Sequence, residues 1–400
     1  MGKKIGLGVL ILVAGFAIYV LFIYDIFSWF RSGPVTVVKD DVQPIAEVTP
    51  QQDYKVETVV EGLKNPWALQ FMPDGRIIVT EKEGTIRIVE NGVLSAAIAG
   101  VPKVHVQQEG GLMDIELHPD FANNGWLYLA YAVNNGTSNM TRIARYRLTP
   151  NGLTDELIIM PGVPSNNNGR HFGSRLRFGP DGKLYVTLGE KGDVERSQNV
   201  QDLLGKTLRY NDDGSIPMDN PYSGEPYARP EIFSYGHRNA QGMDFQPGTG
   251  LMFQTEHGPS GNDGPRGGDE VNIVEKGKNY GWPLVHHKES LQGTEPPLLE
   301  YTPAVAPSGA MFYTGDKFPE WANNFFFTNL RGECIIRVEL DGRNVKGHEV
   351  MFKGEYGRLR DITTGPDGYI YFITSVTDPY GPGRAGGDRI MRIVPASENG

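Results

Sequence analysis

The sequence predicts an all-β chain folded as a six-bladed β-propeller and preceded by one N-terminal transmembrane helix. Three observations support this. A strand–turn–strand unit recurs six times, the strands alternate polar and apolar residues or are fully apolar, and a long apolar run opens the chain. Helical periodicity is absent after residue 54, so the body of the chain is expected to consist of strands and turns.

The apolar run follows Lys3 and Lys4 and is broken mainly by Asp25. About 20 apolar residues are enough for one helical crossing of a bilayer, so residues 1–31 are expected to form an uncleaved signal anchor. A cleaved signal peptide is the alternative, but the run exceeds a usual h-region and no convincing cleavage site follows it. With both lysines inside, the rest of the chain is expected on the extracytoplasmic side of the cytoplasmic membrane.

Residues 32–53 mix Pro, Gln and charges without periodicity and are expected to form a linker to a single catalytic domain, residues 54–400. In this domain a Pro-containing turn, often Pro-Asp-Gly, precedes an alternating strand and then a strand carrying Arg or Lys. The marker prolines are Pro73, Pro119, Pro180, Pro247, Pro319 and Pro366. Their spacings, about 46 to about 72 residues, lie near or above a propeller-blade period.

Six four-stranded blades packed radially would leave few open sheet edges, and the longer units would carry inserted loops. A large β-sandwich or a β-helix is the alternative fold. It accounts for the irregular spacing but not for six similar units, so the propeller is favoured.

The composition excludes several classes of partner and site. The formal net charge is -10, and no basic cluster occurs beyond Lys3 and Lys4, so no nucleic-acid partner is expected. Cys334 is the single cysteine, which excludes an intrachain disulfide and a cysteine-based zinc or iron–sulfur site. Its strand-like surroundings favour a buried thiol over a nucleophile.

Three inserted loops, residues 161–173, 190–205 and 256–268, interrupt equivalent places in successive units and are expected to meet on one face. His171 lies in the first loop, immediately before a strand, where a histidine suits a general base. Glu190, at the end of the next strand, could orient the imidazole. From this segment alone, a surface or structural histidine has nearly equal weight.

Charged residues in the later units suggest ligand contacts. Arg238 and Asn239 could contact carboxylate or quinone-like oxygens, although such an arginine is often a tie between blades. The segment after them could bind a hard cation through the Gly258 and Pro259 carbonyls and nearby carboxylates, although it lacks the spacing of an EF-hand. Arg358 and Arg360 lie two apart and suit a polycarboxylate ligand, with interblade ion pairs as the alternative.

Taken together and in order, these segments resemble the quinoprotein sugar dehydrogenases, namely the soluble glucose dehydrogenase and aldose sugar dehydrogenase family. The resemblance covers roughly residues 57–394 and rests on the combination of eight segments. They read NPWALQFMPDG, EGGLMDIELHPDF, RHFGSRLRFGPDGKLYVTLGE, YGHRNAQGM, EHGPSGNDGPRGGDEVN, NYGWP, APSGAMFY and GRLRDI. Members of this family are six-bladed propellers that use pyrroloquinoline quinone (PQQ).

The resemblance implies roles for the candidate residues. His171 would be the catalytic base, with Glu190 as its support and Arg238 as a catalytic group beside the quinone. Cofactor contacts would come from Glu109, His171, Arg238, Asn239, Gly258, Pro259, Arg331, Arg358 and Arg360, and the Gly258 and Pro259 carbonyls would also bind Ca²⁺. Two positions depart from the family pattern: Glu109 replaces a glutamine, and Leu330 and Arg331 stand where a cofactor-contacting lysine is expected.

The expected function is therefore oxidation of the C1 hydroxyl of an aldose sugar to a lactone by hydride transfer to PQQ, with electrons passed to an external acceptor. The alternative, from another functional class, is a cofactor-less extracytoplasmic propeller that binds a protein or glycan ligand.

Overall fold

The structure, a computed structural model, describes residues 38–39, 53–381 and 387–396. The chain divides into two units, Met1–Val38 and Lys39–Gly400. The predicted anchor, residues 1–31, lies outside the described residues. Among the residues that the structure describes, no helix is both long enough and apolar enough to cross a membrane.

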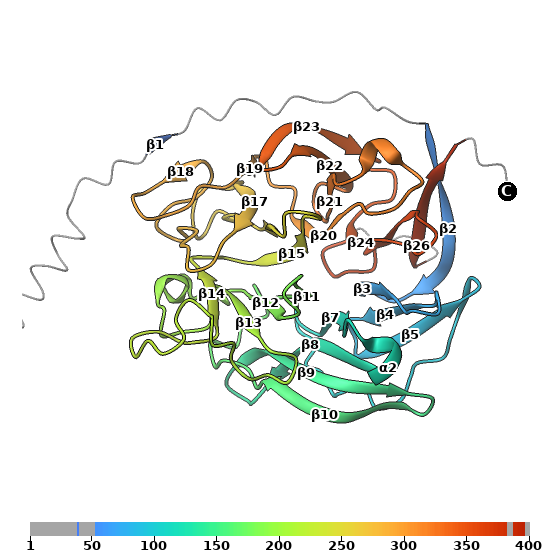
Figure 1. Ribbon diagram of the computed structural model, residues 1–400, viewed down its shortest axis with the longest axis horizontal. Helices are drawn as coiled ribbons and strands as arrows, with labels where there is room; N and C mark the ends of the chain where they lie inside the picture. Colours follow the sequence, from blue (N-terminus) through green and yellow to red (C-terminus); the bar gives the residue numbers. More distant parts are fainter. Residues whose placement is uncertain (1–37, 40–52, 382–386, 397–400) are drawn as a thin grey trace, which may run out of the picture. The chain divides into compact units, whose positions relative to one another are not determined.

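The second unit contains six antiparallel four-stranded sheets arranged around a central axis (Figure 1). In chain order, the first three blades are β3 (Pro66–Phe71), β4 (Ile77–Glu81), β5 (Thr85–Glu90), β6 (Val93–Leu94); β7 (Leu112–Leu117), β8 (Trp126–Asn134), β9 (Asn139–Thr149), β10 (Gly152–Met160); and β11 (Gly173–Phe178), β12 (Leu184–Leu188), β13 (Lys206–Tyr210), β14 (Ile232–Tyr235). The six-bladed propeller predicted from the repeats is confirmed.

The next two blades are β15 (Ala240–Phe245), β16 (Met252–Glu256), β17 (Asp269–Val274), β19 (Leu299–Tyr301); and β20 (Pro307–Phe312), β21 (Phe325–Asn329), β22 (Cys334–Asp341), β23 (Asn344–Met351). The sixth consists of β24 (Leu359–Thr364), β25 (Ile370–Thr374), β26 (Asp388–Pro395) and β2 (Tyr54–Leu63). The remaining elements are β1 (Val38–Lys39), β18 (Glu289–Ser290), the short helix α2 (Phe121–Asn124) and two 3-10 turns, Val194–Gln198 and Pro319–Trp321.

The sixth blade closes the ring, because its outer strand β2 comes from the start of the domain and pairs antiparallel with β26 (Figure 1). The innermost strands β3, β7, β11, β15, β20 and β24 neighbour one another in turn, and β24 neighbours β3. Pairing the first strand with the last joins the two ends of the domain, so the propeller cannot open without breaking a sheet.

Acidic residues on the inner strands tie neighbouring blades together. Asp114 of β7 accepts the Leu176 N–H of the next blade at 2.6 Å, and Asp361 of β24 accepts the Leu69 N–H of the first blade at 3.1 Å. Arg175, which is buried, lies 2.9 Å from Asp114 and 3.2 Å from Asp361. One guanidinium therefore links carboxylates of the second and sixth blades across the centre of the propeller.

In each blade, the pairing of the innermost strand with the second strand is irregular near the start of the innermost strand. Examples are the shifts between Gly173 and Leu176 in β11 and between Ala240 and Gly242 in β15. Such bulges change the direction of nearby side chains and are common beside binding sites. The loops that precede the inner strands lie at this end of the propeller.

Cys334 is a buried free thiol, as predicted, and burial raises its pKa to about 11.

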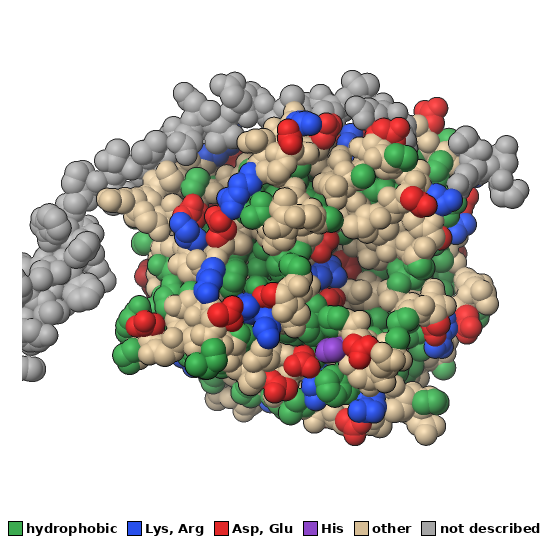
Figure 2. All heavy atoms as spheres, viewed as in Figure 1, with side chains coloured by type: hydrophobic (Ala, Val, Ile, Leu, Met, Phe, Trp, Pro, Cys, Tyr) green, Lys and Arg blue, Asp and Glu red, His purple; other side chains and the backbone are tan. Residues whose placement is uncertain are grey.

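On the face seen in Figure 2, Lys and Arg side chains are interspersed with Asp and Glu over the visible surface. The charges on this face are thus mixed rather than gathered into a patch of one sign.

Candidate active site

The site begins with the pair His171 and Glu190, which the antiparallel register of β11 and β12 brings together. The Nδ1 atom of His171 lies 2.6 Å and 2.8 Å from the two carboxylate oxygens of Glu190. Glu190 is fully buried, while 8 % of His171 is exposed. A carboxylate in this position accepts the Nδ1–H and leaves Nε2 as the basic atom of the neutral imidazole.

Two further histidines lie nearby but have their Nε2 atoms engaged. His237 contacts Glu256 through Nδ1 at 2.9 Å and the Ser234 hydroxyl through Nε2 at 2.8 Å. His257 contacts a backbone carbonyl through Nε2 at 2.8 Å, and burial together with a neighbouring arginine lowers its pKa to about 3. Within the described part of the chain, the Nε2 of His171 makes no hydrogen bond, so His171 is the histidine suited to accept a proton.

Glu109 and Asn239 hold the backbone around His171. The Glu109 carboxylate accepts the His171 N–H at 2.8 Å and lies 3.4 Å from the Asn239 amide nitrogen. The Asn239 oxygen accepts the Gly173 N–H at 3.0 Å. His171 has a φ of 51°, in the left-handed region that non-glycine residues seldom adopt. These two residues therefore help to fix an unusual backbone conformation at the candidate base.

Arg238 is held by several groups of the third inserted loop. Its guanidinium contacts Asp263 at 2.7 Å and 2.9 Å and the Ser260 hydroxyl at 3.1 Å. Burial would raise the pKa of Asp263, but the charge of Arg238 together with hydrogen bonds from Ser260 and Arg238 lowers it below its usual value. The Arg238 guanidinium also lies 5.5 Å from the centre of the Trp282 ring. Arg238 is therefore a fixed positive charge beside an aromatic ring.

The Gly258–Pro259 segment borders a small cavity that is also lined by Glu256 and Glu270. Burial and the neighbouring Glu256 raise the pKa of Glu270 well above its usual value. Carboxylates and backbone carbonyls are the ligands that hard divalent cations prefer, so these residues fit Ca²⁺. In the described ranges, no three or more His, Cys, Asp or Glu residues are grouped to hold a metal ion, so backbone carbonyls would be needed.

Asp269 has a structural role in the same segment. Its carboxylate accepts the backbone N–H groups of Gly258, Val305 and Ala306 at 2.8, 2.7 and 2.6 Å. Three such hydrogen bonds fix the loop against the next blade. Asp263 and Asp269 are therefore occupied within the protein.

Arg358 and Arg360 come together around Asp378, at 3.7 Å and 3.1 Å. The ion pairs considered from the sequence therefore exist, but two guanidiniums share one carboxylate. The buried Nε atoms of both arginines have no hydrogen-bond partner among the described residues. Burial lowers the pKa of each arginine. Two guanidiniums on one carboxylate leave an excess of positive charge, which fits a ligand with several carboxylates.

Arg331 stands apart from the other candidates, because its side chain is exposed at the turn between β21 and β22. Its neighbour Leu330 is buried, and the Leu330 carbonyl lies 3.4 Å from a terminal nitrogen of Arg358. The turn thus borders the arginine cluster, although the structure gives the Arg331 side chain no contact with it.

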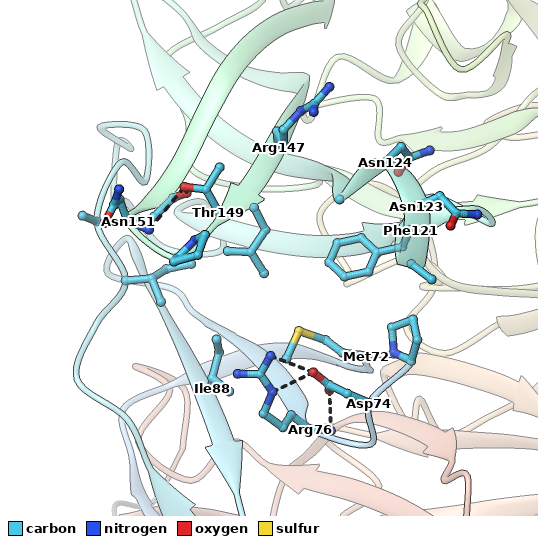
Figure 3. A pocket seen from close by; sticks show the side chains of 18 of the residues that line it. Met72, Asp74, Arg76, Ile88, Phe121, Asn123, Asn124, Arg147, Thr149 and Asn151 are labelled. Carbon is cyan, nitrogen blue, oxygen red and sulfur yellow. Dashed lines mark hydrogen bonds and ion pairs between the residues drawn. The ribbon is translucent and has the colours of Figure 1, made fainter.

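A cavity of about 990 Å³ lies elsewhere, between the first two blades (Figure 3). Its lining includes Asp74, Phe121 and Thr149, which lie in turns or beside them. Asp74 follows β3, whereas His171 precedes β11, the equivalent strand two blades later. The cavity is therefore at the other end of the inner strands and does not belong to the site.

Comparison with known proteins identifies the family. The glucose/sorbosone dehydrogenase family model matches residues 63–380. The chain belongs to this family. It is 38 % identical over 337 residues to an aldose sugar dehydrogenase of Escherichia coli, covering 80 % of this chain and 89 % of that protein. It is 30 % identical over 426 residues to quinoprotein glucose dehydrogenase B of Acinetobacter calcoaceticus, covering 82 % of this chain and 86 % of that protein.

A solved structure of a family member contains the cofactor. The PQQ-bound aldose sugar dehydrogenase of Streptomyces coelicolor superposes with a TM-score of 0.75 at 31 % identity, covering 86 % of this chain and 99 % of that one. The resemblance to quinoprotein sugar dehydrogenases is confirmed, and the chain is an oxidoreductase of the glucose/sorbosone dehydrogenase family.

Sequence reasoning missed three polar residues at this family site. Lys82 is buried, donates to the Gln108 carbonyl, and has its pKa lowered by burial. Asp378 joins the two arginines, and Lys191 follows Glu190 directly. The signal for Lys191 was its place between two glycines in the GEKG turn. Asp378 offered none, because it lies 18 residues after Arg360.

Proposed function

We propose that this chain is a PQQ-dependent aldose sugar dehydrogenase that oxidises the C1 hydroxyl of aldoses to lactones and passes the electrons to an external acceptor. The observation that carries the proposal is the buried His171–Glu190 pair, whose Nε2 makes no hydrogen bond within the described residues and whose backbone is held by Asn239 and by the Arg238 carbonyl. Relatives named as dehydrogenases favour this proposal over a cofactor-less binding propeller.

His171 would take the proton of the C1 hydroxyl at Nε2. Glu190 would keep the Nδ1–H in place and stabilise the imidazolium that results, because the two groups are 2.6 Å apart and the carboxylate is buried. Loss of the hydroxyl proton together with a hydride from C1 converts the sugar to its lactone. His171 is thus a catalytic residue in this proposal, and Glu190 positions it.

When bound, PQQ supplies the acceptor for the hydride. Arg238 and Asn239 would contact its quinone oxygens, where a fixed positive charge favours the reduced form. Arg358 and Arg360 would face its carboxylates with their positive charge, which Asp378 balances only in part. The carbonyls of Gly258 and Pro259 would hold Ca²⁺, with Glu256 and Glu270 nearby.

The test is reconstitution of the purified full chain with PQQ and Ca²⁺, followed by dye reduction with a panel of aldoses. We expect saturable quinone binding and sugar-dependent dye reduction that is lost on removal of Ca²⁺ and in His171→Ala. Absence of quinone binding by the wild-type chain, or undiminished turnover in His171→Ala, would show the proposal to be wrong.

We also propose that residues 1–31 anchor the enzyme in the cytoplasmic membrane as a single-pass helix, with the catalytic domain outside the cytoplasm. The support is the length of the apolar run and the position of Lys3 and Lys4. Alkaline phosphatase fused after residue 400 should be active in a bacterial host and remain in the membrane fraction. An inactive fusion would contradict the orientation, and a released one would contradict the anchor.

A further inference from the structure

Lys191 contacts both chain neighbours of His171. Its Nζ atom donates to the Arg170 carbonyl at 2.9 Å and lies 3.1 Å from the centre of the Phe172 ring. Only 1 % of Lys191 is exposed. A single buried ammonium therefore holds the residue before the candidate base by a hydrogen bond and the residue after it by a cation–π contact.

The backbone of Lys191 is held in return by the loop that carries His171. The side-chain amides of Asn166 and Asn168 donate to the Lys191 carbonyl at 2.8 Å and 2.6 Å. Lys191 and His171 both have left-handed backbones, with φ of 64° and 51°. Each such conformation costs about 1–3 kcal/mol and persists only where the surroundings impose it. The two segments therefore constrain each other.

Gly189 shows how closely the two segments approach. A Cβ atom at this position would lie 2.1 Å from the His171 carbonyl oxygen. A backbone contact this tight leaves room only for glycine. The GEKG turn thus places its lysine against the His171 segment with little freedom to move.

A second buried lysine shows what a purely structural role looks like. Lys206 donates to three carbonyls, those of Arg196, Ser197 and Leu204, at 2.8, 3.0 and 2.6 Å. Burial lowers the pKa of Lys191 and of Lys206 alike, to about 7. Lys191 makes one such hydrogen bond, to Arg170, and one contact with an aromatic ring, that of Phe172. Both partners are chain neighbours of His171, so the interactions of this buried lysine are confined to the segment that carries the candidate base.

We propose that Lys191 is a positioning residue that keeps His171 in its left-handed backbone conformation, with Nδ1–H on Glu190 and Nε2 open to the substrate. This inference rests on the proposed function only for the role of His171 as the base. The conformational part concerns the protein without quinone or sugar.

The decisive variant is Lys191→Met, which keeps the length of the side chain and removes the charge. Its matched control is Lys206→Met, the same change at the other buried lysine. In the full chain in detergent, ¹³C-histidine labelling gives a spectrum of eight residues, and the Cδ2 shift of His171 reports its tautomer. We expect a single Nδ1–H form in the wild type and in the control, and a mixed or broadened signal in Lys191→Met.

Kinetics of the quinone-loaded chain provide the second readout. A misplaced base can lower turnover about 100-fold, so we expect that loss of kcat in Lys191→Met with the sugar KM within about twofold. If Lys191→Met does not fold, Lys191→Gln, which keeps a donor for the Arg170 carbonyl but no charge, should show a smaller loss of the same kind.

An unaltered His171 signal in a folded Lys191 variant would overturn the proposal, as would equal losses of kcat in Lys191→Met and Lys206→Met. Failure of the wild-type chain to oxidise any sugar would instead contradict the proposed function. The histidine spectrum of the unloaded chain would still decide the positioning role.

Discussion

Glu190→Gln is the sharpest test of the base assignment. The substitution preserves the size of the side chain but replaces a carboxylate that can only accept hydrogen bonds with an amide that can also donate. The carboxylate oxygens lie 2.6 Å and 2.8 Å from the His171 Nδ1. Because the Gly192 N–H donates to Oε2 at 3.0 Å, the amide nitrogen would take the other place, 2.8 Å from Nδ1. There it would compete with the Nδ1–H and favour a proton on Nε2, the atom that must take the substrate proton.

Glu190→Gln would lower turnover both through the wrong tautomer of His171 and through the lost negative charge. Loss of the correct tautomer in a histidine–carboxylate pair costs about 10⁴-fold in turnover, or about 5.4 kcal/mol in the barrier. Loss of the charge that stabilises the imidazolium costs about 4 kcal/mol for charges about 4 Å apart at an effective dielectric constant of about 20, or about 10³-fold. We therefore expect kcat to fall by about 10³- to 10⁴-fold with little change in quinone affinity.

The assay is dye reduction by the quinone-loaded chain under saturating sugar, with quinone affinity measured separately by titration. The control is Glu349→Gln, the same change in the buried Arg337–Glu349 ion pair of the fifth blade, whose atoms are 2.8 Å apart. That variant should lose stability but keep kcat within about threefold. A loss of kcat below tenfold in Glu190→Gln, with quinone bound, would refute the role given to the pair.

Three further predictions concern the scaffold. Asp114→Ala should lower the free energy of unfolding by about 3–5 kcal/mol, because it removes a charged partner of the buried Arg175. The control Asp74→Ala, in an exposed ion pair, should change the free energy of unfolding by less than about 1 kcal/mol. Similar values for the two variants in urea titrations would contradict this prediction. Burial lowers the pKa of Lys206 to about 7, so between pH 7 and about 10.5 the unfolded chain binds more protons, and stability should rise by up to about 1.4 kcal/mol per pH unit. Because burial lowers the pKa of Lys191 to about 7 as well, Lys206→Met should keep the Lys191 contribution and lose only its own, so its rise in urea titrations at several pH values should be shallower than that of the wild type. Parallel curves would argue against it. Cys334, with a pKa of about 11, should react with a disulfide reagent at pH 8 only when the protein unfolds, and labelling of the native chain would contradict its burial.

The blades were predictable because each one repeats a local chemical signal. A Pro-Asp-Gly turn sets a tight reversal, and the alternating strands on either side bury one face. The closure of the ring was not predictable in this way. β2 pairs with β26 across more than 300 residues, and no feature of residues 54–63 distinguishes an outer strand of the sixth blade from one of the first.

The partners of the candidate residues were harder to predict than the residues themselves. Arg358 and Arg360 are adjacent on one strand, so their pairing follows from the sequence, but Asp378 arrives from a loop beyond the next strand. Glu109 was expected to contact the cofactor, and the structure shows it accepting the His171 N–H. Such contacts depend on how the loops of different blades pack against one another, and the spacing of residues in the sequence does not predict that packing.

The propeller repeat explains why one histidine suits catalysis and a similar one does not. His171 and Glu190 are 19 residues apart, and so are His237 and Glu256 one blade later. Each pair joins a histidine just before an inner strand to a glutamate at or just after the end of the next strand, although the two pairs do not occupy equivalent positions in the repeat. The same kind of histidine–carboxylate contact therefore occurs in two successive blades. In the second pair, Ser234 occupies Nε2 and the ring stacks on a tyrosine. In the first, Nε2 is open, so the loop before the strand, rather than the pair itself, decides which copy can accept a proton.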